Sequence, residues 1–113
     1  MSAEQWEIQK YVTESDVCPF DRWFETLDKQ TQARIDVRFD RLRLGNFGDH
    51  KSVGEGVYEL RFSFGPGFRV YYGFAGRRLV LLLAGGSKKD QSRDIKASQK
   101  FWKAFQSERR RGT

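Results

Sequence analysis

Two runs of alternating apolar and polar residues, separated by a Gly-Pro-Gly break, dominate the middle of the chain. The first run covers residues 57–64 and the second covers 68–74. Alternation with a period of two is typical of strands with one buried face, so the pattern predicts a β-hairpin. The apolar face of this hairpin is predicted to hold Tyr58, Leu60, Phe62, Phe64, Phe68, Val70, Tyr72 and Phe74.

The other face of the hairpin is polar. It carries Glu59 and Arg61 on the first strand, and Arg69 and Tyr71 on the second. With Gly-Pro-Gly as the loop, we expect Ser63 to lie opposite Arg69, and Arg61 to lie opposite Tyr71. The clustered charges make this face the first candidate for function.

The segment before the hairpin predicts a strand and two helices. Alternation over residues 6–12 indicates the strand. Pro19 suits the first turn of a short helix, and Asp28 is placed to cap a longer one that Gly45 ends. Apolar residues recur at helical spacing in the short helix at Phe20, Trp23, Phe24 and Leu27, and in the longer helix at Ile35, Phe39 and Leu42.

The remaining segments predict a loop, a buried strand and a final helix. Residues 45–56 are polar and rich in glycine, which indicates an ordered loop. The uninterrupted apolar run 79–84 is typical of a strand buried on both faces. Asp90 is placed to cap the last helix, and from about residue 108 we expect a frayed basic tail. The apolar side of that helix is predicted to hold Ile95, Ser98, Phe101, Trp102 and Phe105.

This succession gives the order β-α-α-β-β-β-α, an α+β domain whose small, mainly antiparallel sheet packs against helices. A chain of 113 residues is long enough for a hydrophobic core, and we expect residues 1–113 to form a single domain. No apolar run approaches the roughly 20 residues of a membrane span, and the N-terminus lacks the features of a signal peptide. For these reasons we expect no membrane contact. The lone Cys18 cannot form an internal disulfide, which favours a cytoplasmic location.

The chain is basic, with a net charge of +6 and a pI of about 9.7. This charge suits a polyanionic partner, such as nucleic acid, the ribosome or an acidic protein, without choosing among them. The longer helix contributes a basic stripe of Arg34, Arg38 and Arg41. The stripe is compatible with a solvated face, with RNA contact and with a partner surface.

Several kinds of chemistry lose weight because their residues are missing. One His and one Cys cannot build a Cys/His metal site. The segment 85–89 lacks the spacing of a Walker A loop, and neither a complete GxGxxG motif nor a GxSxG motif is present. We therefore expect no metal, no nucleotide and no other small-molecule cofactor.

What remains is the cationic face with Arg61 and Arg69, and Lys88 and Lys89 at its rim. Guanidinium groups hold phosphate through paired hydrogen bonds, and they can stabilise the extra charge of a pentavalent transition state. Glu59 could equally pair with the two arginines across the strands. The residues alone therefore leave a salt-bridged scaffold, RNA binding and RNA cleavage as open alternatives.

Several segments in combination resemble the RelE/ParE superfamily of type II toxins, specifically its HigB-like branch of addiction module killer proteins. The similar segments are residues 45–49 with the helix pair before them, 56–61, 64–72, 82–88, and Gln91 with Asp94-Ile95. The resemblance implies a ribosome-dependent mRNA endonuclease held inactive by a cognate antitoxin, often a small helix-turn-helix protein. In such enzymes the RNA 2′-hydroxyl attacks the adjacent phosphate, so no metal is needed.

The resemblance also implies roles for individual residues. By analogy Arg69 holds the scissile phosphate, while Arg61 and Lys89 stabilise developing charge. The best-known RelE toxins carry a lysine where this chain has Glu59, and a tyrosine near the C-terminus where it has Ile95. Glu59 or His50 then becomes the candidate general base. The candidate RNA-binding residues are Lys88, Tyr71, His50, Lys51 and Arg38.

Two alternatives to cleavage stay open within the same superfamily. The first is a ParE-like protein that inhibits DNA gyrase without being an enzyme. The second is a degenerate toxin that acts only as an antitoxin-binding partner. The cationic face and its two arginines favour cleavage.

Overall fold

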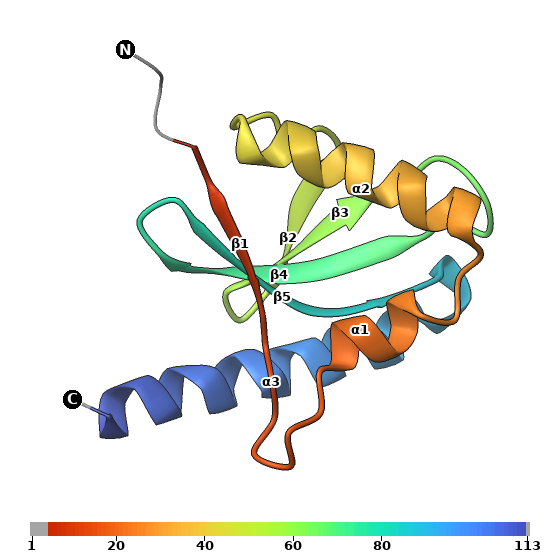
Figure 1. Ribbon diagram of the computed structural model, residues 1–113. Helices are drawn as coiled ribbons and strands as arrows, with labels where there is room; N and C mark the ends of the chain where they lie inside the picture. The colour runs from red at the N-terminus through yellow and green to blue at the C-terminus, as the bar shows by residue number, and fades with distance from the viewer. Residues whose placement is uncertain (1–4, 113) are drawn as a thin grey trace.

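A five-stranded sheet with helices packed against both faces forms the protein, and the computed structural model describes residues 5–112 (Figure 1). The strand order is β1-β5-β4-β3-β2, with β1 parallel to β5 and the other neighbours antiparallel. In chain order the elements are β1 (Glu7–Lys10), α1 (Pro19–Phe24), α2 (Lys29–Arg43), β2 (His50–Gly54), β3 (Val57–Arg61), β4 (Arg69–Gly76), β5 (Leu79–Gly86), the 3-10 turn η1 (Lys88–Asp90) and α3 (Gln91–Arg111). The prediction of an α+β fold with a mainly antiparallel sheet is confirmed.

Helix α2 packs on one face of the sheet through the side chains that helical spacing predicted to be buried. Ile35, Phe39 and Leu42 are buried and share a core with Leu60, Val70 and Tyr72 of the hairpin. The helix starts where expected, because Asp28 Oδ1 accepts a hydrogen bond of 2.7 Å from the backbone N–H of Thr31. The cap at Asp28 is confirmed, and the apolar hairpin face is confirmed except at Phe74, whose side chain is 38% exposed.

The opposite face of the sheet is covered by α3. Trp102 of α3 lies against Gly73 of β4, where a Cβ atom would come within 2.5 Å of the indole ring. Glu59 and Tyr71, which we expected on an accessible polar face, are completely buried. The prediction of an open polar face is therefore wrong, because the apolar stripe of α3 takes the same surface to exclude water.

The hairpin register also differs from the prediction. Arg61 lies opposite Arg69 and Glu59 opposite Tyr71, which is a shift of two residues. The loop is longer than Gly-Pro-Gly, since Phe62 N–H donates to the Phe68 carbonyl at 3.0 Å and pairing stops beyond it. A shift of two residues keeps every side chain on its expected face, because the period of a strand is also two.

The segment 45–56, predicted to be a loop, contains strand β2. This strand adds one element to the expected order and pairs with β3 at the edge of the sheet. Most of its side chains are exposed, so it lacks the apolar alternation that marks the other strands. The turn into β3 has positive φ at Gly54 (94°), Glu55 (56°) and Gly56 (81°), which explains the glycines that suggested a loop.

Helix α3 is amphipathic along its length. Its predicted apolar side chains all pack into the second core, which consists of Ile95, Phe101, Trp102 and Phe105 of α3 with residues of the sheet. Ser98 is buried among them. The helix continues to Arg111, beyond the residue from which we expect fraying. Within residues 5–112, no helix combines the length and the hydrophobicity needed to cross a bilayer.

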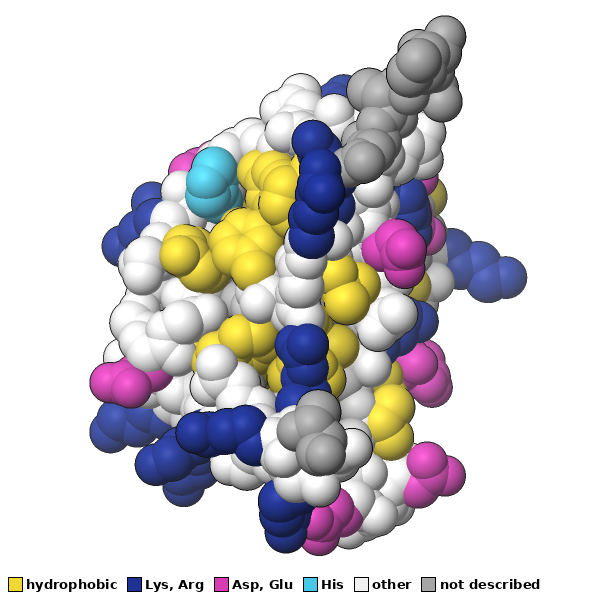
Figure 2. All heavy atoms as spheres, turned by 90° about the vertical axis from the view of Figure 1, so that its left-hand side faces the viewer, with side chains coloured by type: hydrophobic (Ala, Val, Ile, Leu, Met, Phe, Trp, Pro, Cys, Tyr) yellow, Lys and Arg dark blue, Asp and Glu magenta, His cyan; other side chains and the backbone are white. Residues whose placement is uncertain are grey.

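An aromatic cluster closes the α2 face at the end of the sheet next to β1. Trp6 contacts Phe47 and Phe74, and Tyr58 contacts Phe74, with ring centroids 5.0 to 5.5 Å apart. Figure 2 shows hydrophobic side chains gathered beside His50, the single histidine. Phe47 thus anchors the chain between α2 and β2 against the body of the fold.

Candidate functional site

A buried carboxylate, Glu59 on β3, connects the residues that the sequence singled out. Its Oε1 accepts a hydrogen bond from Arg61 Nε at 2.9 Å, and its Oε2 accepts one from Gln91 Nε2 at 2.8 Å. Arg69 Nε lies 3.9 Å from the same Oε2. A buried carboxylate is tolerated when it is paired and hydrogen-bonded, and these contacts meet that condition. Glu59 therefore ties β3, β4 and the first turn of α3 together.

The two arginines lie opposite each other on β3 and β4 and differ in exposure. The side chain of Arg61 is 33% exposed and that of Arg69 is 11% exposed. The bond to Glu59 uses only the Nε of Arg61, so its terminal nitrogens can donate to a phosphate. The hydrogen bond that Arg61 donates to the Glu59 carboxylate raises the pKa of Arg61 further, which keeps the guanidinium charged. Arg61 and Arg69 thus form a cationic site that the buried Glu59 carboxylate supports from below.

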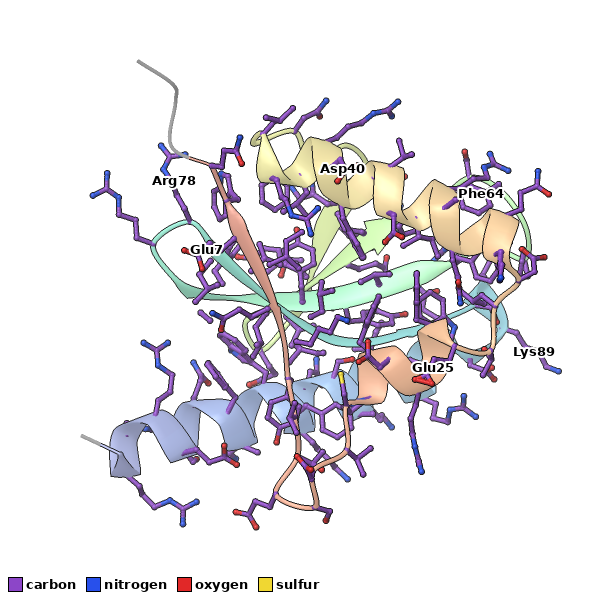
Figure 3. All side chains as sticks on the ribbon, viewed as in Figure 1. Glu7, Glu25, Asp40, Phe64, Arg78 and Lys89 are labelled. Carbon is purple, nitrogen blue, oxygen red and sulfur yellow. The ribbon has the colours of Figure 1, made fainter. Side chains whose placement is uncertain are left out.

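The turn η1 brings one of the two candidate lysines to this pair. A Cβ atom on Gly67 would lie 3.2 Å from both Arg69 Nη1 and Lys88 Cβ, so the two side chains meet over this glycine. Arg69 Nη1 donates to the Gly67 carbonyl at 2.8 Å. Lys89 is exposed and extends outward from the turn (Figure 3). The structure thus gathers Arg61, Arg69 and Lys88, and it does not bring Lys89 beside them.

Tyr71 is not available to stack on a base. It lies on the Glu59 face of β4 and is completely buried in the second core beneath α3. Burial raises the pKa of its hydroxyl well above the usual value, so the group stays protonated. The predicted RNA-binding role of Tyr71 is therefore wrong.

Arg38 on α2 holds the backbone instead of facing solvent. Its guanidinium donates to the carbonyls of Phe47 (3.0 and 3.2 Å), Asp49 (2.8 Å) and Arg61 (2.6 Å), and it lies 4.9 Å from the ring centre of Phe62. Burial lowers its pKa. These contacts use most of the donors that a phosphate would need, so Arg38 has a structural role here, and RNA binding by Arg38 stays a prediction.

The two candidates on β2 lie on opposite faces of the sheet. His50 pairs with Leu60 and therefore projects to the α2 face, where its Nδ1 lies 2.8 Å from the Gly48 carbonyl. This places it away from the arginine pair and removes it as a general base there. Lys51 pairs with Glu59, projects to the same face as Glu59, and is exposed. Lys51 thus extends the cationic site, and His50 does not.

Sequence reasoning assigned no role to two residues at the start of α3. Gln91 is one of the groups that hold Glu59. Asp94 packs on Gly86, where a Cβ atom would come within 1.9 Å of Oδ2, and this buried oxygen has no hydrogen-bond partner. Burial raises the pKa of Asp94. The signal for both was their place in the first turn of a helix directly after the glycines that end β5.

Among the described residues, no group of His, Cys, Asp or Glu is arranged to hold a metal ion. The Glu59 cluster itself offers two guanidinium groups on neighbouring strands, with the exposed Lys88 near Arg69. Guanidinium groups can bind a phosphodiester, and they can stabilise added charge on it.

The profile of the family described as "Phage derived protein Gp49-like (DUF891)" matches residues 22–104. The chain belongs to this Gp49-like family. An uncharacterized protein of Haemophilus influenzae is 46% identical over 81 residues, which cover 71% of this chain and 82% of that protein. No solved structure matches the chain.

The Gp49-like family is associated with toxin–antitoxin systems and is related to RelE-type toxins. This supports the broader part of the resemblance and implies an antitoxin as partner in general. The matched range contains the whole Glu59 cluster and the turn η1, whereas β1 lies outside it. The candidate site is thus part of the region that defines membership of the family.

Proposed function

We propose that this protein is a HigB-like toxin that cleaves mRNA on the ribosome and acts in the cytoplasm. The observation that carries the proposal is the pair of arginines facing each other on β3 and β4 and held by one buried carboxylate. A small helix-turn-helix antitoxin is the proposed partner that keeps the toxin inactive.

The proposed reaction is a transesterification within the RNA. The 2′-oxygen attacks the adjacent phosphorus and gives its proton to water, the bond from phosphorus to the 5′-oxygen breaks, and that oxygen takes a proton from water. Arg69 holds the phosphate, while Arg61 and Lys88 stabilise the charge that develops on it. Pre-positioned cations of this kind are effective because they need no reorganisation during the reaction.

Glu59 acts in this proposal as a positioning residue. Its two oxygens are already engaged by Arg61 and Gln91, and the side chain is inaccessible to a 2′-hydroxyl. A carboxylate at this position fixes the direction of the guanidinium groups. Glu59 therefore stands at the position where the best-known RelE toxins carry a lysine, but it has a different chemical role.

The proposal is tested by expressing the chain without an antitoxin and mapping mRNA 5′ ends on translating ribosomes. We expect cuts in phase with codons, reduced about 100-fold or more in Arg69→Ala, since removing one preorganised donor costs that much in comparable sites. Arg41→Ala, which removes an exposed arginine of α2, is the matched control and leaves cleavage unchanged.

Two other results would contradict the proposal. Intact messages together with relaxed or broken chromosomes would indicate a ParE-like inhibitor of gyrase. Growth with neither effect would indicate a degenerate toxin that only binds its antitoxin.

A further inference from the structure

A second cationic surface lies along α3, apart from the Glu59 cluster. It is an open groove of about 450 Å³ between α3 and the turn that joins β2 to β3. Its charged lining consists of Lys96, Lys100, Lys103 and Arg110 on the helix and Glu55 on the turn, all of them exposed. Cations outnumber the single carboxylate, so the groove attracts anions.

The walls of the groove are fixed in place. Gln99 Nε2 of α3 donates to the carbonyls of Val53 (3.1 Å) and Gly54 (3.5 Å). Trp102 forms the floor and lies so close to Gly56 that a Cβ atom there would come within 2.6 Å of the indole nitrogen. The turn cannot move away from the helix without breaking these contacts, so the groove exists before any partner binds.

The spacing of the lysines suits a long polyanion. Lys96, Lys100 and Lys103 follow each other at helical spacing on one face, and Arg110 extends the row to about 21 Å at 1.5 Å per residue. Like charges at such spacing destabilise an isolated helix. A row of phosphates along the groove would remove that repulsion, whereas a single small anion would not.

The groove also leads toward the arginine pair. Gln99, which lines the groove, donates to the Val53 carbonyl of strand β2, and two residues earlier on the same strand Lys51 lies opposite Glu59. The exposed Lys51 therefore lies on the Glu59 side of the sheet and on the strand that the groove residue Gln99 contacts.

We infer that the groove binds the phosphate backbone of a folded RNA, which positions the arginine pair on its substrate. This rests on the proposed function, because the ribosome supplies the RNA. Contact with an acidic protein is less suited to the groove. Protein interfaces concentrate their binding energy in accessible aromatic and aliphatic anchors and are depleted of lysine, and here Trp102 is only 6% exposed. Flexible lysines are well suited to phosphates, whose recognition depends on charge.

The test compares the wild-type chain with the variant Lys96→Gln/Lys100→Gln/Lys103→Gln. The probe is a labelled RNA hairpin with 2′-O-methyl riboses, which cannot be cleaved by 2′-hydroxyl attack, and binding is followed by fluorescence anisotropy. We expect affinity to fall about 10- to 100-fold near 0.1 M salt, and the slope of log K against log[salt] to become shallower by about 2 to 3. Lysine and glutamine have similar helix propensities, so the variant should fold.

The matched control is Arg22→Gln/Lys29→Gln/Arg43→Gln, which removes as much charge from exposed positions on α1 and α2. An equal loss of RNA binding in both variants would mean that the affinity depends on net charge alone, and this would overturn the inference. Unchanged binding in the lysine variant would overturn it too. If poly-glutamate, but not the hairpin, loses affinity for the lysine variant, the groove serves an acidic protein instead. Hairpin binding is measured without cleavage, so its outcome is separable from that of Arg69→Ala on ribosomes.

Discussion

Arg38 donates a hydrogen bond to the backbone carbonyl of Arg61, and yet the two residues use their guanidinium groups differently. Arg38 donates to several backbone carbonyls, including that of Arg61, and closes the segment between α2 and β2 against the end of β3. Arg61 donates to the buried Glu59 through its Nε, which leaves its terminal nitrogens available for a ligand. In a structural arginine, most guanidinium N–H groups donate to protein carbonyls. In a candidate for phosphate binding, a carboxylate orients the guanidinium through one nitrogen and leaves the terminal nitrogens for the ligand.

Removal of the Glu59 carboxylate is expected to have the largest effect on the arginine pair. In Glu59→Ala the two arginines would face each other across the strands with no counter-charge, and Gln91 would lose its acceptor. Removing one partner of a buried ion pair typically costs 3–5 kcal/mol, so we expect the free energy of unfolding to fall by about that amount. Urea denaturation followed by circular dichroism measures it.

Glu25→Ala is the control for this experiment, because Glu25 is exposed at the end of α1 (Figure 3). Its stability should stay within about 0.5 kcal/mol of the wild type. If Glu59→Ala unfolded at the same urea concentration as the wild type, Glu59 would not be the residue that organises the site.

The structural role of Arg38 is tested by Arg38→Ala. This change leaves the carbonyls of Phe47, Asp49 and Arg61 without their donor. We expect a loss of about 2–4 kcal/mol in the free energy of unfolding, since hydrogen bonds from charged donors contribute more than neutral ones. Arg38→Lys should recover little of it, because one ammonium cannot reach carbonyls that a planar guanidinium spans.

Arg41→Ala serves as the control on the same helix, with an expected change below about 0.5 kcal/mol. RNA hairpin binding adds a second measurement. A loss of RNA affinity in Arg38→Ala that exceeds its loss of stability would show that Arg38 also contacts RNA.

The sequence supplied the parts of the fold that depend on local periodicity. The burial of Leu60, Val70 and Tyr72 follows from alternation, and the start of α2 follows from the capping chemistry of Asp28. Strand β2 was not predicted from the sequence because an exposed edge strand has no apolar face and so no alternating pattern. The register of the hairpin was not predicted correctly because the length of the loop depends on tertiary packing.

The candidate site was predictable in its residue types and not in its accessibility. Arg61 and Arg69 were identified, and they do lie together. The burial of Tyr71 and the backbone contacts of Arg38 were not predicted for one reason: whether a polar side chain meets solvent depends on what packs over it. Here the covering elements are α3 above Tyr71 and the segment 47–49 beside Arg38. No pattern within a single strand or helix contains that information.

Asp94 is a second carboxylate near the arginine pair, with a side chain that is 13% exposed and without the partners of Glu59. Its Oδ2 packs on Gly86, which lies opposite Arg69, and has no hydrogen-bond partner. Burial raises the pKa of Asp94 in the folded protein, so the folded state binds its proton more tightly than the unfolded state does. The wild type therefore loses stability from this group as the pH rises through the raised pKa, and regains it at pH values below the unfolded pKa.

Asp94→Asn removes that titration. We expect the variant to be slightly more stable than the wild type at neutral pH, by about 1 kcal/mol or less, with the difference shrinking toward acid pH. Thermal unfolding across a pH series measures the difference, and Asp36→Asn on the exposed side of α2 is the control. An Asp94→Asn variant that is less stable than the wild type at neutral pH would mean that the ionised carboxylate is stabilising. Arg93, whose Nε lies 3.5 Å from Oδ1, would then be its effective partner. In that case Asp94 would belong with Glu59 as a second carboxylate that supports the cationic site.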